Sequence, residues 1–516
     1  MSRMRRFVQA LVSSYLSLAA TTVYTIVSVP LALHFLTRSE FGLWALMAQI
    51  GGYLALIDMG MSTSMARFLI DHKDHPERGE YGSVLQTGQL VLLVQGLIVA
   101  LAGYVLSPLL APLLDIPPAL RHSFVVLMRW QSVLLGATMA TKTLVHVLYA
   151  HQRIYVTNYA QPLGAAVMTG VLWVAFRCGA GVVSVVWANA AAWLVGMIIL
   201  ACTCLKLHLF PPPGAWGRAS WARFKELFGF SKDMFLIALG QQLMSASQTI
   251  VITRTLGLEK VAIWSVGTRV FTLLWLLTRR IFDFSVPPLA EILVRKEHAR
   301  LRERFKAVTV LSISVGGLAA VLAGACNASF VTFWTHGRIT WTVGCDVLLG
   351  VWLIVLAAQY CHVGFVGVTK DIRFARWIFL VEGVVFVVLA SFVARWAGLA
   401  GIIGCSAVCT ICISGAYGMR RSCEYFAIPW TEPGWNWLKP LGRTLLGLVP
   451  LAVAVWWLTE PLAEWQRMLL RGVLLGSLGS CLLLRYGLPI ELKRELIQRL
   501  PESVGRWMRR VMGDLS

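Results

Sequence analysis

The sequence predicts an all-α polytopic membrane protein, and three observations lead to that prediction. Hydrophobic residues make up 57% of the 516 residues and charged residues only 14%, where a typical soluble domain has roughly 25% charged residues. Apolar stretches of roughly 20 residues, the length that crosses a bilayer core of about 30 Å, recur along the whole chain. The chain also carries 46 Lys and Arg against 25 Asp and Glu, a net charge of +21.

This composition excludes several classes of protein. A disordered chain would be poor in hydrophobic residues, and a soluble protein of this length would form about three domains with far more charged surface. Basic residues between apolar stretches are typical of cytoplasmic membrane loops, so no nucleic-acid partner is expected. The eleven cysteines lie mostly within apolar stretches and lack zinc-site spacing, so they predict neither a disulfide framework nor a metal site.

About fourteen transmembrane helices are expected, and the first six form an N-terminal bundle. The first apolar segment follows Arg3, Arg5 and Arg6, as in a signal peptide, but it continues to about Leu36 without a convincing cleavage site. It is therefore interpreted as an uncleaved transmembrane helix. The six segments are 11–36, 42–69, 84–108, 122–149, 155–176 and 181–204.

A polar, proline-rich link separates this bundle from eight further helices. These are expected at 231–256, 261–289, 307–333, 343–368, 374–394, 398–419, 441–459 and 467–487. The predicted domains are an N-terminal six-helix bundle (1–205), a cytoplasmic link (206–230), a C-terminal six-helix bundle (231–420), a link with helices 13 and 14 (421–488), and a basic amphipathic cytoplasmic tail (489–516).

The distribution of basic residues predicts the orientation of these helices. With the N-terminus in the cytoplasm, the segments that fall inside carry 34 Lys and Arg, whereas those outside carry nine and the spans themselves carry three. Since Lys and Arg accumulate in cytoplasmic loops, this asymmetry predicts that both termini are cytoplasmic.

An internal repeat relates the two bundles at a shift of about 220 residues. Residues 36–44 align with residues 256–264 with a one-residue gap, and long basic inner loops follow Arg67 and Glu291 at corresponding places. An even number of helices in each half makes the halves parallel, as in transporters that place a substrate site between two repeats.

Two stripes of polar residues occupy corresponding helices of the repeat. The first contains Ser14, Ser17, Thr21, Thr25 and Ser28, and the second contains Gln241, Ser245 and Gln248. Steps of three and four residues put each set on one helix face. A shared polar cavity is favoured for Thr21, Thr25, Gln241 and Gln248, because glutamine in hydrocarbon is unfavourable without a partner or water. Close helix packing is the alternative.

Several basic side chains within the spans predict an anionic ligand. Arg269 and Arg280 are eleven residues apart on one helix, on the same face and about 16 Å apart along its axis. Lys142 lies deep in the fourth helix, where Arg129 and His146 also occur, and Arg67 lies near the inner end of the second helix. Without matching anions, such cations suit a phosphate group. Snorkelling to an interface is an equal alternative for Arg67 and Arg129.

Titratable residues in the spans are candidates for ion or proton coupling, namely Asp58, Asp283 and His146, with His362 and Glu382 as further candidates. Each could instead form a local pair, as Asp283 could with Arg279 or Arg280. No Walker A loop, Gly-x-Ser-x-Gly elbow or metal-ligand cluster is present, so neither an enzyme nor a cofactor is expected.

The second helix resembles a known family. Tyr53, Leu56, Asp58, Gly60 and Arg67 match the pattern YxxLxDxGxxxxxxR of bacterial Wzx-type polysaccharide and O-antigen flippases, which belong to the multidrug/oligosaccharidyl-lipid/polysaccharide exporter superfamily. Residues 40–44 resemble the segment that precedes this pattern, and residues 149–153 resemble the family's inner turn after the fourth helix. The resemblance covers the first half directly and the second half through the repeat.

The resemblance implies two six-helix bundles in a V-shaped arrangement that opens alternately to each side of the bacterial inner membrane. The substrate would be an oligosaccharide on undecaprenyl pyrophosphate, for O-antigen, lipopolysaccharide or exopolysaccharide synthesis. Arg269 and Lys142 would then bind the phosphates, Arg67 and Arg280 would guard the inner mouth, and the polar stripes would contact sugar or water. Partners would be this lipid-linked oligosaccharide, inner-membrane lipids, and a polysaccharide polymerase and chain-length regulator.

Two other functions stay open. Multidrug exporters of the same superfamily share the architecture but usually have twelve helices and bind cationic drugs, which a cation-lined cavity disfavours. A membrane-embedded O-antigen polymerase or ligase would be a different class, but it needs a sizeable periplasmic loop with arginines and a catalytic histidine. The longest external loop expected here is short, near residues 107–121.

Overall fold

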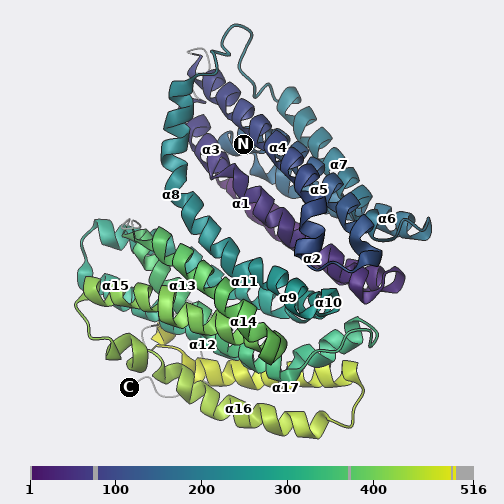
Figure 1. Ribbon diagram of the computed structural model, residues 1–516. Coiled ribbons are helices and arrows are strands. Elements are labelled where there is room, and N and C mark those ends of the chain that lie inside the picture. Colours follow the sequence, from purple (N-terminus) through teal and green to yellow (C-terminus); the bar gives the residue numbers. More distant parts are fainter. Residues whose placement is uncertain (1–2, 74–78, 370–373, 490–491, 495–516) are drawn as a thin grey trace. The chain divides into compact units, whose positions relative to one another are not determined.

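The computed structural model describes residues 3–73, 79–369, 374–489 and 492–494 of the chain. Every regular element in these described ranges is a helix, which confirms the all-α prediction (Figure 1). The chain divides into two compact units, Met1–Ala262 and Ile263–Ser516. The predicted domain boundaries stay a prediction, and the predicted tail at 489–516 lies outside the described residues except for 489 and 492–494.

The first unit contains nine of the α-helices that the structure describes. They are α1 (Arg3–Phe35), α2 (Arg38–Ala55), α3 (Met61–His72), α4 (Glu80–Leu113), α5 (Pro118–Ala150), α6 (Ile154–Arg177), α7 (Ser184–Lys206), α8 (Trp221–Ser245) and α9 (Ser247–Leu256). Helix α4 packs along α5, α6 packs against both α1 and α7, and α3 contacts α4 and α5 (Figure 1). The pair α4–α5 is close because Gly96 and Gly136 face each other, where an added Cβ would overlap the opposite backbone oxygen.

The predicted helix 42–69 is not continuous. Its first part starts earlier, at a capping box in which the Thr37 side chain accepts a hydrogen bond from the Glu40 backbone and the Glu40 carboxylate accepts one from the Thr37 backbone. It ends in a 3₁₀ turn, Leu56–Asp58, followed by Met59 (φ 49°) and Gly60 (φ 76°). Left-handed residues cannot continue a right-handed helix, so α3 starts in a new direction after Gly60.

The link between α7 and α8 packs on the start of α4. The Tyr81 hydroxyl donates a hydrogen bond to the Leu209 carbonyl (3.1 Å), and the Ser83 hydroxyl donates one to the Arg218 carbonyl (2.8 Å). Gly82 lies against the Trp216 backbone so closely that a Cβ would overlap it. Tyr81 is also a member of a buried apolar cluster that joins α3, α4 and α5 through Leu69, Val84 and Val147.

The second unit is organised around one long helix. Its elements are α11 (Arg269–Val294), α12 (His298–Trp334), α13 (Val343–Val368), α14 (Ala375–Cys409), a π-helical segment (Thr410–Gly415), α15 (Ala416–Phe426), α16 (Lys439–Thr459) and α17 (Glu464–Leu482), and α10 (Leu258–Gly267) spans the boundary with the first unit. Helix α12 packs against α11, α13, α16 and α17. The last two helices therefore belong to the same compact body as α12.

By length and composition, the described residues contain twelve helices able to cross a membrane, or thirteen if α10 and α11, bent by 42°, form one span. The prediction of about fourteen is higher because Ala375–Phe426 counts here as a single span of 52 residues. Such a helix would be about 78 Å long, more than twice a bilayer core. Gly398 (φ 58°, ψ −142°) interrupts it, directly at the start of the predicted segment 398–419.

Candidate functional site

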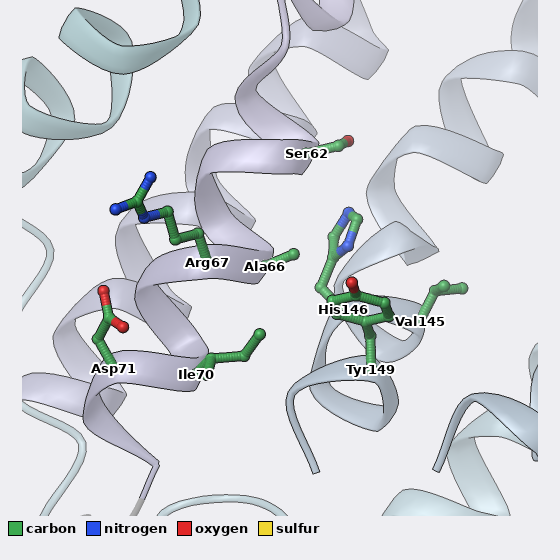
Figure 2. Close-up of a pocket in the computed structure, with 8 residues that line it drawn as sticks. All are labelled: Ser62, Ala66, Arg67, Ile70, Asp71, Val145, His146 and Tyr149. Atoms are coloured by element: carbon green, nitrogen blue, oxygen red, sulfur yellow. The ribbon is translucent and has the colours of Figure 1, made fainter. Parts of the chain in front are cut away.

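A cavity of about 520 Å³ lies between α3 and α5 of the first unit and offers a candidate site. Its lining consists of Ser62, Ala66, Arg67, Ile70 and Asp71 from α3 and of Val145, His146 and Tyr149 from α5. Figure 2 shows Ser62 and Ala66 pointing towards α5, with Arg67 and Asp71 on another side of α3. The helical repeat explains the lining, since Ser62, Ala66 and Ile70 are four residues apart and share a face.

An ion pair lies next to this cavity. The Asp58 side chain, at the end of the turn before α3, has its Oδ1 atom 3.8 Å from Nζ of Lys142 on α5. The Ser62 hydroxyl donates a hydrogen bond to the same Oδ1 atom (2.5 Å), and Gln95 of α4 donates one to the Asp58 backbone carbonyl (3.3 Å). The expectation of a cation without a matching anion is therefore wrong for Lys142. The sequence could not show this, because the pair forms across two helices that are 84 residues apart in the chain.

His146 lies one helical turn beyond Lys142 and faces the cavity (Figure 2). Its Nε2 atom is buried, and no hydrogen-bond partner for that atom occurs among the described residues. Arg67 lines the same cavity with an exposed side chain. The structure thus brings together four residues that the sequence singled out separately: Asp58, Arg67, Lys142 and His146.

Arg269 and Arg280 lie in the second unit, both on α11 and both exposed. Arg269 falls within the predicted span 261–289, but it is the first residue of α11, directly after the break at Gly267 and Thr268. Asp283 of the same helix accepts a hydrogen bond from the Tyr360 hydroxyl of α13 (2.7 Å). A local partner therefore explains the placement of Asp283, whereas its role in coupling stays a prediction.

Sequence reasoning missed the polar cluster that holds the break before Arg269. The Asn327 amide of α12 donates hydrogen bonds to the Gly267 carbonyl (2.9 Å) and to Oδ1 of Asp346 (2.7 Å), and the Trp341 indole donates to the same Oδ1 atom (2.7 Å). Asp346 is only 1% exposed. Two signals were available, namely an amide within the apolar segment 307–333 and a carboxylate at the start of the apolar segment 343–368.

The two polar stripes are only partly as expected. Thr21 and Thr25 donate to backbone carbonyls of their own helix (2.9 and 3.0 Å), and Ser17 is paired with Gln161 of α6, so part of the first stripe serves helix packing. The second stripe is not one continuous face, because α8 ends at Ser245 and α9 begins at Ser247. Gln241 is exposed, whereas Gln248 is buried.

The arrangement in the first unit combines basic groups suited to an anion with two carboxylates, Asp58 and Asp71. It offers one guanidinium and one ammonium group, with an imidazole and hydroxyl groups nearby, at a cavity large enough for a diphosphate. No group of three or more His, Cys, Asp or Glu side chains placed to hold a metal ion occurs in the residues that the structure describes.

Comparison with known sequences gives one family. A family model described as "Polysaccharide biosynthesis protein" matches residues 31–333, which is more than half of the chain. Of the residues proposed for phosphate, sugar or ion contact, Thr21, Thr25, His362 and Glu382 lie outside this range. No protein with a curated description matches the sequence.

Comparison with solved structures gives a fold. An inward-facing conformation of a multidrug resistance MATE family transporter of the MOP superfamily matches with a TM-score of 0.66 at 13% identity, covering 79% of this chain and 95% of that one. The lipid II flippase MurJ in an inward closed conformation matches with a TM-score of 0.66 at 11% identity, covering 92% and 99%. A Pyrococcus furiosus MOP superfamily transporter, for which a reverse polarity of the binding pocket suggests a different function, matches with a TM-score of 0.57 at 12% identity, covering 82% and 96%.

Proposed function

The chain belongs to the polysaccharide biosynthesis protein family, and from this premise we propose that it is an alternating-access flippase for lipid-linked oligosaccharides. The substrate is an undecaprenyl-pyrophosphate-linked oligosaccharide repeat unit. The protein moves it across the bacterial inner membrane for the synthesis of O-antigen or exopolysaccharide. Both termini are cytoplasmic, and a polysaccharide polymerase and a chain-length regulator act on the same pathway.

The observation that carries this proposal is the combination of that family with a multi-pass fold like that of superfamily transporters. Between the two neighbour functions, the extent of the likeness favours a flippase. The lipid II flippase structure covers 92% of this chain, whereas the multidrug transporter structure covers 79%. Helices α16 and α17, which follow the two predicted six-helix bundles, are part of the compact second unit and agree with the longer architecture.

The charges of the candidate site support an anionic headgroup. Arg67 and Lys142 in the first unit, and Arg269 and Arg280 on the exposed face of α11, supply the groups that bind phosphate oxygens. Thr21, Thr25, Gln241 and Gln248 contact sugar or water, and Asp58, Asp283 and His146 are the groups available for ion or proton coupling.

A deletion strain tests this function in the cell. A flippase deletion should leave lipid-linked repeat units on the cytoplasmic face of the inner membrane, since synthesis continues without transport. Unpolymerised units already on the periplasmic face would instead indicate a polymerase or ligase. Purified protein in vesicles, given a defined lipid-linked saccharide and a proton or sodium gradient, should move the saccharide. Movement of cationic drugs alone would favour the multidrug exporter.

A further inference from the structure

The Asp58 carboxylate is held in place beside the candidate site by its own segment. It ends the turn between α2 and α3, it accepts a hydrogen bond from Ser62, and Gln95 anchors its backbone carbonyl. The left-handed residues Met59 and Gly60 fix the direction in which the chain leaves. The Asp58 side chain is only 16% exposed, and its carboxylate faces Lys142.

The contact between Asp58 and Lys142 is an open ion pair. The 3.8 Å between Oδ1 and Nζ is longer than the roughly 2.7–2.9 Å of a charge-assisted hydrogen bond. The Lys142 side chain is 32% exposed, which leaves its ammonium group accessible to a second partner. The ammonium is thus neutralised at longer range and is not locked into a close pair.

The formal charges around the cavity cancel. Arg67 and Asp71 from α3 line it, Lys142 stands one turn from His146 on α5, and Asp58 faces Lys142. Two positive and two negative side chains give a neutral site when His146 and Tyr149 are uncharged. An anion that enters such a site gains little unless one carboxylate gives up its cation, and Asp58 is the carboxylate paired with Lys142.

We propose that Asp58 is a built-in competitor for the phosphate groups of the substrate at Lys142. In the empty protein Asp58 neutralises Lys142, and a diphosphate oxygen takes its place when the substrate enters. The fixed carboxylate then remains close to the bound diphosphate and repels it, which speeds release on the far side. This inference rests on the proposed function for its class of ligand, a diphosphate ester. It adds a mechanism by which the site releases that ligand.

Binding of inorganic pyrophosphate to the purified full-length protein in detergent tests the exchange, measured by calorimetry without divalent cations. Asp58→Asn keeps an oxygen that accepts from Ser62 but removes the charge, so it should bind pyrophosphate at least about tenfold more tightly than the wild type. Asp58→Ala should also bind pyrophosphate more tightly than the wild type, and it provides a second test if Asp58→Asn does not fold.

Asp115→Asn is a matched control, because it also removes one carboxylate from the first unit. Asp115 is exposed, precedes the other end of α5, about 36 Å along the axis from Lys142, and has φ 52°, a conformation that asparagine accepts. It should leave pyrophosphate affinity unchanged. In the Lys142→Gln background, Asp58→Asn should no longer tighten binding, because the cation for which it competes is gone.

Three results would overturn the exchange: unchanged affinity in Asp58→Asn, equal tightening with and without Lys142, or no pyrophosphate binding by any variant.

Vesicle transport separates this inference from the proposed function. Saccharide transport by the wild type, with no affinity change in Asp58→Asn, would remove only the competitor. Tighter pyrophosphate binding in Asp58→Asn without wild-type saccharide transport would leave the exchange intact and remove the proposed substrate. Transport by Asp58→Asn should itself be slowed, since release is hindered.

Discussion

Arg269 is the residue at which substrate contact can be tested most directly. Arg269→Ala should reduce polymer export to below about a tenth, because a lost hydrogen bond to a charged group is worth about 1.5–3 kcal/mol. Arg269→Lys should retain partial export, since the charge remains while the guanidinium fork is lost. Export is measured as surface polymer, and membrane protein level is measured in parallel.

Arg254→Ala is the control for this experiment. Arg254 is also an exposed basic residue, on α9, and belongs to no proposed phosphate site. It should export normally. Wild-type export by Arg269→Ala would remove Arg269 from the substrate site.

At the scale of single residues, the sequence predicted the members of the candidate site but not their pairing. Asp58, Arg67, Lys142 and His146 stand out because charged and imidazole groups are rare in apolar segments. Their partners come from the fold: Lys142 of α5 meets Asp58 because α2, which leads into the turn that Asp58 ends, packs against α5. Side-chain periodicity carries no information about such contacts across helices.

At the scale of elements, the aligned segments of the internal repeat meet at α2 and α10. An added Cβ at Gly42 would overlap the carbonyl oxygen of Leu258. Unlike a flexible side chain, a backbone oxygen in a helix cannot relieve the overlap by changing rotamer. Gly42→Ala should therefore destabilise the protein by about 1–3 kcal/mol, seen as a lower melting temperature in detergent. Gly51→Ala, on the same helix with open space around it, should have a much smaller effect and is the matched control.

The break between α10 and α11 is an element that the Asn327 cluster maintains. Asn327→Leu removes the donor to the Gly267 carbonyl and one donor to the buried Asp346 carboxylate. It should cost about 1–3 kcal/mol of stability and lower export, because Arg269 follows the break directly. Thr332→Val is the control, since the Thr332 hydroxyl on the same helix donates to the Ala328 carbonyl of its own helix (3.0 Å). Equal melting temperatures for the two variants would contradict the role of Asn327.

Most helices could be predicted from hydrophobic length, whereas their interruptions could not. The breaks at Gly60, Ala246 and Gly398 lie within apolar segments. Glycine and alanine also occur inside continuous membrane helices, so their presence does not predict a break. What decides is local backbone conformation, as in the positive φ angles of Gly60 and Gly398, and this depends on packing that the sequence does not display. The prediction of a continuous second helix therefore failed while its boundaries were nearly right.

At the scale of the whole molecule, Arg471 ties the last two helices to the rest of the second unit. It is 1% exposed and donates hydrogen bonds to Thr459 of α16 (2.7 Å) and to the Ala325 carbonyl of α12 (3.1 Å). Its guanidinium also lies 3.9 Å from the ring centre of Trp456. The pair α16–α17 is thus part of the folded body.

Arg471→Ala should lower stability by about 3 kcal/mol, because it leaves a cavity and removes the bonds between α12, α16 and α17. Thermal unfolding in detergent measures this. Arg467→Ala, one turn earlier on α17 with a more exposed side chain, should be milder. Similar losses for both would show that the three-helix junction is not specific to Arg471.

The link that packs on α4 has a consequence for how the protein can be dissected. Because Leu209, Trp216 and Arg218 are fastened to the N-terminal end of α4, this segment should resist trypsin in the native state despite its arginine. A fluorescent reporter inserted into this link would disrupt its contacts with α4. Splitting the gene within this link for co-expression would likewise yield two fragments, each lacking some of the residues that form these contacts.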